Sequence, residues 1–304
     1  MKEKIKTIVI IVMGVLLIGA AGYLVYSGFD DESELVSAVQ SKEYVYNMEC
    51  GIIHNCASLR EGDFEQITYD FDAPEYRELI DKYNIVQIAG QGSEFEKALN
   101  LMNYFAPRLS HNSNYSDYSK DMNAVSLLGY ALDNPQHGIF CRAKAQIMNE
   151  VYLSLGIYSR KLWINPLSVY DHECHVVNEI WDGEYQKWIM LDTTNNAYWV
   201  GEEKIPLSAI EIRDKLSEQQ FLTPVRPGEN PDDLQNHCEW REHLLLYTAK
   251  NMAYLQYLLH YGVGEDDMAY ALLPEAMEPA DDCLISKEAV LASPLEVQAH
   301  IMRE

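Results

Sequence analysis

The sequence of this 304-residue chain predicts an α+β fold, in which a helix that carries a cysteine packs on an antiparallel sheet that carries a histidine and an aspartate. Three observations predict this fold. An apolar pattern of helical period follows Cys141, two β-prone runs are joined through Asp182-Gly183, and an uncharged apolar stretch of membrane-spanning length lies near the N-terminus. We expect an N-terminal transmembrane helix before this core and a mostly helical C-terminal extension after it.

The N-terminal segment is predicted to be a membrane anchor. Ile8 to Tyr26 contain no charged side chain, and three lysines precede them. About twenty apolar residues span the core of a bilayer, and cationic flanks stay on the cytoplasmic side. We therefore expect a cytoplasmic tail over residues 1–6, a single transmembrane helix over 7–27, and the rest of the chain outside the cell. A cleaved signal peptide is the alternative, because Gly19-Ala-Ala-Gly22 is a weak version of a cleavage site.

Three further parts are expected after the anchor. Residues 28–60 are typical of a stalk or irregular linker, residues 61–222 are expected to form the main domain, and residues 223–304 an extension packed on it. A turn-rich break opens this extension, and the polar residues of the helix predicted from Cys238 to about His260 indicate core packing and argue against a second membrane span. The segment from Ala269 onward is expected to add a strand and a last helix.

The main domain is predicted to begin its helical part at a capping box. Ser93-Glu-Phe-Glu96 has the sequence of such a box and would open a helix through about Tyr104. The polar, tyrosine-rich run from Tyr115 to Asn123 is typical of a loop. A short helix is expected over Asn123 to Leu132.

The next predicted helix carries the cysteine. Asn134 to Gly138 form a turn-rich entry, and Gly156 is a C-terminal stop signal. Cys141 therefore lies in the first turn, where unpaired backbone N–H groups and the positive end of the helix dipole favour a thiolate over a thiol. The same N–H groups could donate to an oxyanion. The residues expected on the buried face are Ala145, Met148, Val151, Tyr152 and Leu155.

A strand over Ile157 to Ile164 and then a β-hairpin are predicted after this helix. The arms of the hairpin are His175 to Trp181 and Glu184 to Asp192, because Asp-Gly between two β-prone runs is a strong hairpin signal. Four other residues of the hairpin are expected to serve sheet packing or a solvated strand face: Asn178, Glu179, Trp181 and Trp188.

The hairpin register decides whether His175 and Asp192 meet. A four-residue loop from Asp182 to Tyr185 places His175 directly opposite Asp192, and a two-residue loop places Asp192 opposite Glu173. Both registers leave the imidazole and the carboxylate as neighbours on one face. A three-residue loop with a bulge would instead put them on opposite faces.

Three blocks of the sequence, Gly138-Ile-Phe-Cys141, His175-Val-Val-Asn-Glu179 and Trp188-Ile-Met-Leu-Asp192, resemble the catalytic blocks of the transglutaminase-like superfamily. The resemblance covers roughly Phe95 to Val200. It implies a papain-like core in which Cys141 is the nucleophile, His175 the general acid and base, and Asp192 the residue that orients the histidine.

Within that superfamily, the chain resembles the bacterial, membrane-anchored branch most. Phe140 and Arg142 flank the cysteine, where the vertebrate cross-linking enzymes have Gln and Trp. No residue of this chain matches their upstream oxyanion-stabilising tryptophan or their calcium-binding segments. The bacterial branch includes proteases and amidases as well as cross-linkers, so the resemblance implies the chemistry more closely than the substrate.

The implied chemistry is acyl transfer through a cysteine thioester. The Cys141 thiolate would attack a carbonyl carbon, His175 would protonate the departing amine, and the thioester would pass to water or to a second amine. We favour hydrolysis of peptide or isopeptide amides, because water needs only access to the site. The alternative is a catalytically silent module that binds cell-envelope polymer or a partner protein.

The run from Asp171 to His175 contains five residues of metal-ligand type, but strand alternation argues against a metal site. Alternation puts His172 and Cys174 on the side opposite to His175, whereas zinc needs four ligands that converge. We therefore predict no metal and no cofactor, and we expect Cys174 to face away from the site and to serve packing. A metal-dependent enzyme that uses this run is the weakest hypothesis.

Charge and cysteine content bear on the partners. The net charge of −24 repels phosphate backbones and disfavours nucleic acid as a partner, which leaves a peptide or protein substrate, with cationic peptides or amine-bearing wall polymers as one option. Six cysteines outside the cell would suggest disulfides, yet Cys141 must stay reduced. Cys50 with Cys56 and Cys238 with Cys283 are pairings that the sequence allows and does not require.

Overall fold

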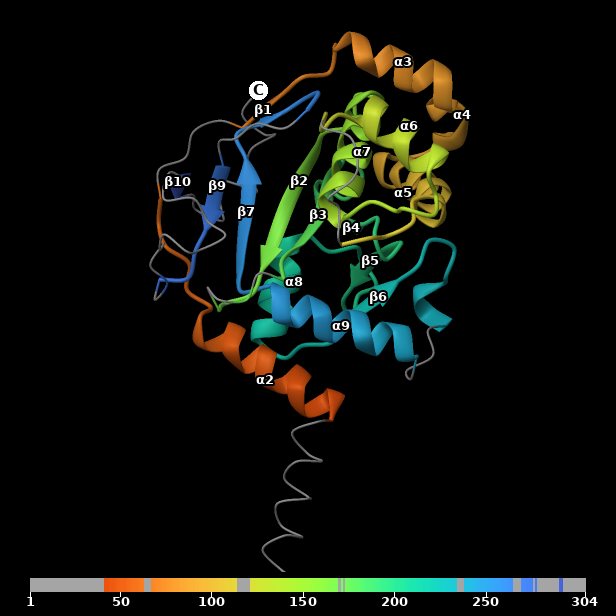
Figure 1. Cartoon of the computed structure of the whole chain (residues 1–304). Helices are drawn as coiled ribbons and strands as arrows, with labels where there is room; N and C mark the ends of the chain where they lie inside the picture. Colours follow the sequence, from red (N-terminus) through yellow and green to blue (C-terminus); the bar gives the residue numbers. More distant parts are fainter. Residues whose placement is uncertain are drawn as a thin grey trace, which may run out of the picture. The chain divides into compact units, whose positions relative to one another are not determined.

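The structure is a computed structural model that describes residues 41–62, 67–113, 121–168, 171, 173–233, 238–264, 269–275, 277 and 290–291 (Figure 1). The chain divides into two compact units, Met1–Asn47 and Met48–Glu304, and the account below concerns the second. The predicted cytoplasmic tail, transmembrane helix and most of the stalk lie outside the described residues. None of the helices within the described ranges has the length and apolar character of a membrane span.

A mixed α+β unit is built on a largely antiparallel sheet of eight strands within the described ranges. The order across the sheet is β10-β9-β7-β2-β3-β4-β5-β6, and only β10 runs parallel to its neighbour. A separate parallel pair joins β1 (Thr68–Tyr69) to β8 (His260–Tyr261). The strands of the large sheet are β2 (Ser159–Asn165), β3 (His175–Asp182), β4 (Lys187–Asp192), β5 (Ala197–Val200), β6 (Thr223–Val225), β7 (Tyr254–Leu258), β9 (Ala269–Leu272) and β10 (Val290–Leu291).

Helices α5, α6 and α7 lie together on one side of β2 and β3 (Figure 1). α7 contacts both strands directly, α5 contacts β3, and α6 packs on α7. The described helices are α2 (Lys42–Asn55), α3 (Pro74–Tyr83), α4 (Ile85–Ala89), α5 (Glu94–Phe105), α6 (Ala124–Asp133), α7 (Cys141–Leu153), α8 (Ala209–Ser217) and α9 (Glu239–Asn251), with 3₁₀ turns at Ala106–Arg108 and Pro231–Asp233. The segment predicted to be an irregular stalk thus contains a helix, α2.

Local signals placed several helix ends correctly. The predicted capping box is present at α5, where Ser93 accepts the N–H of Glu96 and the Glu96 carboxylate accepts the N–H of Ser93. Asn123 caps α6 through the N–H of Ser126. Gly156 follows α7 with a φ of +74°, in the left-handed conformation that commonly ends a helix.

Helix α7 is buried on all sides, whereas the sequence analysis predicted burial of only one face. Every residue from Ala143 to Leu153 is buried, because the helix lies between the sheet and the α3 and α6 helices. Its buried polar side chains bond within the core. Gln146 donates to Glu150 Oε1 at 2.7 Å and accepts from Lys161 Nζ at 2.6 Å.

The β3–β4 hairpin has neither of the two expected registers. Asp182 pairs with Lys187, so the loop consists of residues 183–186. The buried Asp182 carboxylate accepts the N–H of Phe95 at 2.8 Å, near the start of α5, and also the N–H groups of Glu184 and Tyr185. These bonds keep Asp182 in the strand. The residue with positive φ in the loop is Gln186, at 54°, rather than the glycine.

Of the two roles expected for Glu179, sheet packing or a solvated strand face, the structure shows a buried residue. Its carboxylate pairs with Arg160 at 2.7 Å and accepts the first N–H of α8, from Ala209, at 2.7 Å. Asn178 serves sheet packing as expected, since its amide donates to the Ala145 carbonyl of α7 at 2.9 Å. Trp188 is also buried, with the Arg160 guanidinium 3.9 Å from its ring centre.

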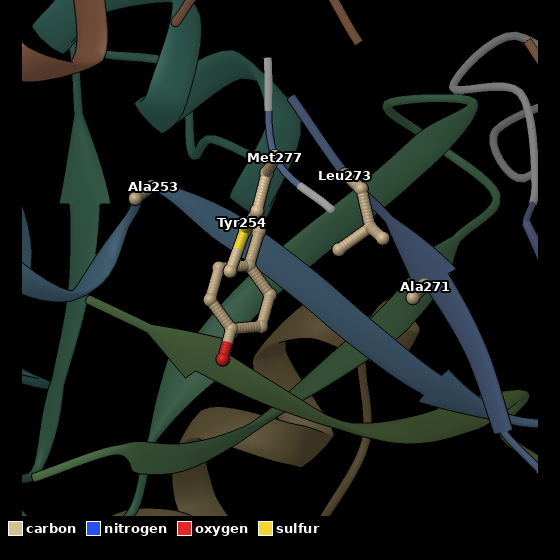
Figure 2. Packing of buried hydrophobic residues seen from close by; sticks show 5 residues of the cluster. All are labelled: Ala253, Tyr254, Ala271, Leu273 and Met277. Atoms are coloured by element: carbon tan, nitrogen blue, oxygen red, sulfur yellow. The ribbon is translucent and has the colours of Figure 1, made fainter. Parts of the chain in front are cut away.

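The extension beyond residue 223 is less helical than predicted. α9 ends at Asn251, and the stretch that follows forms β7, which pairs with β2 on one edge and with β9 on the other. A helix through His260 would leave both of those strand edges unpaired. The strand expected from Ala269 is confirmed as β9, while the last helix falls outside the described residues. Five residues form a buried cluster over β7 and β9 (Figure 2): Ala253, Tyr254, Ala271, Leu273 and Met277.

Candidate active site

Cys141 is the first residue of α7, and the chain that leads into it is held in place. The segment Ser110–Asn112 runs beside the entry, with the N–H of Ile139 bonded to the Ser110 carbonyl at 2.9 Å and the N–H of Asn112 bonded to the Ile139 carbonyl at 3.1 Å. Gly138 has a φ of +68°, and a Cβ there would meet this segment at 3.0 Å. A glycine is therefore required for both backbone conformation and close approach.

His175 and Asp192 lie at corresponding ends of the neighbouring strands β3 and β4. The difference between the observed and the expected register is an even number of residues, so both side chains remain on one face of the sheet. His175 Nε2 lies 2.8 Å from Asp192 Oδ2, and both side chains are buried. The imidazole and the carboxylate are therefore neighbours, as predicted, although the strand register differs from both expected registers.

The loop after β4 holds the Asp192 carboxylate from the other side. Oδ1 accepts the N–H groups of Thr194 and Asn195, and Oδ2 accepts the Asn195 side-chain amide at 2.7 Å. Burial alone would raise the pKa of Asp192, but the charge of His175 and these hydrogen bonds outweigh it and lower the pKa. Our sequence reasoning missed Asn195. An aspartate followed by Thr and Asn is a signal for this kind of Asx turn.

The thiol of Cys141 lies close enough to the His175 ring for a hydrogen bond between them to affect the pKa values of both groups. Burial would raise the pKa of Cys141, yet the hydrogen bond and charge of His175, with a hydrogen bond from the backbone of Val176, lower it. Burial likewise opposes the charge on His175, but the Asp192 carboxylate and the Cys141 sulfur raise the pKa of the imidazole. Both shifts favour a thiolate–imidazolium pair. Because Nε2 faces Asp192, the other ring nitrogen is left for the sulfur.

A cleft of about 930 Å³ opens in front of the Cys141 sulfur. Its walls come from the entry segment, from the sheet, and from the region beyond β5. The lining residues other than Cys141 and His175 are His111, Ser113, Phe140, Glu173, Cys174, Thr194, Asn195, Arg226, Trp240, His243, Leu244 and Tyr247.

Cys174 lines this cleft, so the expectation that it faces away is wrong. β3 begins only at His175, and the strand alternation on which the expectation rested does not extend to residue 174. Burial and the negative charge of Cys141 raise the pKa of Cys174 to about 11, which keeps it a neutral thiol at neutral pH. The two cysteines of the cleft are therefore chemically different.

Helix α9 supplies a wall that the sequence analysis did not assign to the site. The ring of Tyr247 meets the His175 ring edge-on, with the ring centres 5.3 Å apart. Trp240, His243, Leu244 and Tyr247 are spaced as one face of a helix, and all four line the cleft. This spacing was the available signal, but the sequence does not say which surface the face covers.

Two further basic side chains lie near the reactive centre. Lys144, one turn after Cys141, is buried, and burial lowers its pKa to about 8 against the opposing charges of Asp192 and Cys141. Burial, together with the charges of Lys144 and His175, lowers the pKa of His111 in the cleft wall. His111 is therefore predominantly neutral at neutral pH.

The acidic residues of the run before β3 are engaged by a lysine. Lys250 of α9 pairs with Asp171 at 2.9 Å and also with Glu173. His172 lies outside the described residues, and in the part of the chain that the structure describes no group of three or more His, Cys, Asp or Glu could hold a metal ion. Cys56 and Cys238 are free thiols, so neither disulfide that the sequence allows is present.

Comparison with known proteins gives little more. No family model matches the chain, and no curated protein does. A solved structure described as "a putative cysteine protease from Cytophaga hutchinsonii" aligns with a TM-score of 0.32 and 15% sequence identity. The alignment covers 41% of this chain and 40% of that one, so the chain spans well under half of the length of the aligned protein.

Proposed function

We propose that this chain is a thiol-dependent hydrolase or acyltransferase of the transglutaminase-like kind, which acts on peptide or isopeptide amides. The observation that supports the proposal is the continuous contact from the Cys141 thiol to the His175 ring and on to the Asp192 carboxylate. Such an arrangement supplies a nucleophile, a proton carrier and a group that orients the carrier.

The reaction follows from the roles of these groups. The Cys141 thiolate attacks the amide carbonyl carbon, and a C–S bond forms while the carbonyl oxygen becomes an oxyanion. Backbone N–H groups at the start of α7 lack helical partners and can donate to that oxyanion. The C–N bond then breaks as the His175 imidazolium gives its proton to the leaving nitrogen. Asp192 holds the ring in position and stabilises its charge throughout.

The thioester is resolved by a second nucleophile. His175, now neutral, takes a proton from water or from an amine, which attacks the thioester and releases the Cys141 thiolate. We favour water and therefore a protease or amidase, because water needs only the open cleft. Transfer to an amine would make the chain a cross-linker by the same steps.

We further propose that the reaction takes place outside the cell, with residues 7–27 as the anchor. The support is the uncharged apolar run with lysines before it, which favours a cytoplasmic N-terminus. Cell-envelope peptides are then the accessible substrates.

Alkylation of the full-length chain tests the central claim. Iodoacetamide should modify Cys141 rapidly at about pH 7, and His175→Ala should slow the reaction by about tenfold or more, because the imidazolium that lowers the thiol pKa is lost. His243→Ala, which removes another histidine of the same cleft, is the matched control and should have little effect. Equal rates for Cys141 in wild type and His175→Ala would contradict the proposal.

Product analysis separates the remaining options. The full-length chain and Cys141→Ala are incubated with cell-envelope peptides, with and without an added primary amine, and the product masses are measured. A mass gain of one water at a cleaved amide indicates a hydrolase, and incorporation of the amine indicates a transferase. A rapidly alkylated Cys141 without any turnover of these peptides would instead favour the silent binding module.

A further inference from the structure

The charge of the cleft differs from the charge of the chain. The sequence carries a net charge of −24, which would suggest cationic substrates. Among the described lining residues, however, the only carboxylate is that of Glu173, and Lys250 pairs with it. The only arginine of the lining is Arg226, so the local balance around the substrate is not acidic.

Within the described ranges, an aromatic ring rather than hydrogen bonds holds the guanidinium group of Arg226. Its side chain lies over the Trp240 ring, 4.2 Å from the ring centre, and its backbone N–H donates to Glu229 Oε2 at 2.8 Å. In the described part of the chain no acidic side chain forms an ion pair with Arg226. Stacking on an aromatic ring orients a guanidinium while leaving its edge free to bind a planar anion.

The neighbouring arginine has a different role. Arg241 also lies near the Trp240 ring, at 4.7 Å, but it is buried and donates to the Pro224 carbonyl and to the Glu229 carboxylate. The Glu229 carboxylate therefore has two partners. It accepts the backbone N–H of Arg226 and neutralises the charge of the Arg241 guanidinium. Of the two guanidinium groups at Trp240, the Arg226 group is the one that can accept a ligand.

We propose that Arg226, stacked on Trp240, binds a carboxylate of the substrate and so selects acidic peptides for the reaction at Cys141. The inference rests on the proposed function, since it names the substrate class of the same site. Leu244 and Tyr247 lie on the same face of α9 as Trp240, and Tyr247 contacts His175. They form an apolar wall between the carboxylate subsite and the reactive pair. The carboxylate could belong to an acidic side chain or to the end of a peptide.

Paired peptide substrates test the proposal on the full-length chain. One series of peptides places Glu or Gln at successive positions around the scissile amide, and a second ends in a free acid or an amide. The wild type should show a kcat/KM about tenfold higher for the carboxylate member of one pair, mainly through KM. The series in which the preference appears identifies the source of the carboxylate.

Variants of two exposed arginines complete the design. Arg226→Gln should lose the preference by reacting more slowly with the carboxylate member only. Arg77→Gln, which removes the same charge from α3, should leave it unchanged. Arg226→Lys should keep part of it, because the charge remains but the stacked planar group does not. A preference that survives in Arg226→Gln, or a wild type that treats both members equally, would overturn the inference and leave the proposed function standing.

A binding measurement keeps the two claims apart if no peptide reacts. Fluorescence anisotropy of the same labelled peptides with Cys141→Ala reports the subsite without chemistry. Binding that requires the carboxylate and is lost in the Cys141→Ala, Arg226→Gln double variant would support the subsite while the proposed function fails. Equal binding of both members of every pair would reject the subsite as well.

Discussion

At the scale of single side chains, the candidate site is defined by the half-buried Cys141 and the buried His175, whose pKa values shift in opposite directions. His175 lowers the pKa of Cys141, while Asp192 and, to a lesser degree, Cys141 raise the pKa of His175. The ion pair therefore exists in the pH range between the two pKa values, and the opposite shifts widen that range.

The pH dependence of alkylation should reflect this pair. The thiolate is lost as the pH falls through the lowered pKa of Cys141, so the rate with iodoacetamide should decline at a lower pH than the rate of an ordinary thiol. An ordinary thiol would decline below about pH 8.5. In His175→Ala, burial still raises the pKa of Cys141, but the imidazole that lowers it is gone. The midpoint of the pH–rate curve should therefore move to higher pH. A midpoint that does not move would show that the imidazole does not stabilise the thiolate.

Asn195 is expected to act as a positioning residue. Its side-chain amide donates to the carboxylate oxygen of Asp192 that also faces His175. Asn195→Ala should lower kcat by about tenfold with little change in KM, since orientation of the imidazole is affected rather than binding. Asn55→Ala, which removes an exposed amide that bonds within α2, should change neither value. A pH profile of kcat that shifts in Asn195→Ala would distinguish this role from a general loss of stability.

At the scale of elements, one carboxylate links the hairpin to a distant helix. Asp182 ends β3, and it bonds the N–H of Phe95 near the start of α5 as well as two N–H groups of its own loop. Helix starts carry N–H groups without partners, so a buried carboxylate there satisfies donors that would otherwise be costly to bury. The strand register and the position of α5 therefore depend on the same side chain.

Removal of that carboxylate should destabilise the fold. Asp182→Ala leaves three backbone donors without their acceptor, and we expect a loss of about 2–3 kcal/mol in the free energy of unfolding, measured by urea denaturation. Asp182→Asn should lose less, because one carbonyl oxygen remains. The control is Glu184→Ala in the exposed part of the loop. A stability of Asp182→Ala equal to that control would show that these bonds do not set the register.

The cleft wall formed by α9 was not predicted from the sequence, and the reason lies in the tertiary structure. The sequence predicts a core-packed amphipathic helix from Cys238 to about His260, and the structure has a helix there that ends earlier, at Asn251. Which surface the apolar face of that helix covers depends on the pairing of β7 with β2, two segments about ninety residues apart in the chain. Local patterns carry no information on such a pairing.

At the scale of the whole molecule, the sequence predicted most reliably what neighbouring residues decide. The capping box of α5 and the start of α7 at Cys141 follow from local signals, and two of the three loop lengths considered give the shared face of His175 and Asp192. The burial of Glu179 and the register at Asp182 depend on partners elsewhere in the chain, Arg160 and Phe95. Those partners become visible only when the tertiary structure is known.

The global stability should depend on pH through a buried carboxyl group. Burial raises the pKa of Glu150 to about 7, against hydrogen bonds from Gln146 and Gly264. A raised folded-state pKa contributes stability that is complete below the unfolded value and is lost as the pH rises toward the folded value. Glu150→Gln, which removes this ionisation, should therefore gain stability over the wild type by up to about 3 kcal/mol at about pH 8 and by much less at about pH 5.

Urea unfolding at both pH values checks the expectation. Glu78→Gln, an exposed carboxylate of α3, serves as the control and should give the same difference from wild type at both. A Glu150→Gln variant that is equally stabilised or destabilised at the two pH values would mean that Glu150 does not titrate with folding.

The place of β7 between β2 and β9 has a consequence for how the chain can be divided. A fragment that ended soon after Asp192 would lack β7. The backbone of β2 from Leu162 to Asn165, which pairs with β7, would then be exposed. A strand edge without a pairing partner can bind the strands of other chains and so promotes aggregation. The C-terminal extension is therefore needed for a folded protein that does not aggregate. A truncated form of the chain must extend at least to Leu258, the last residue of β7.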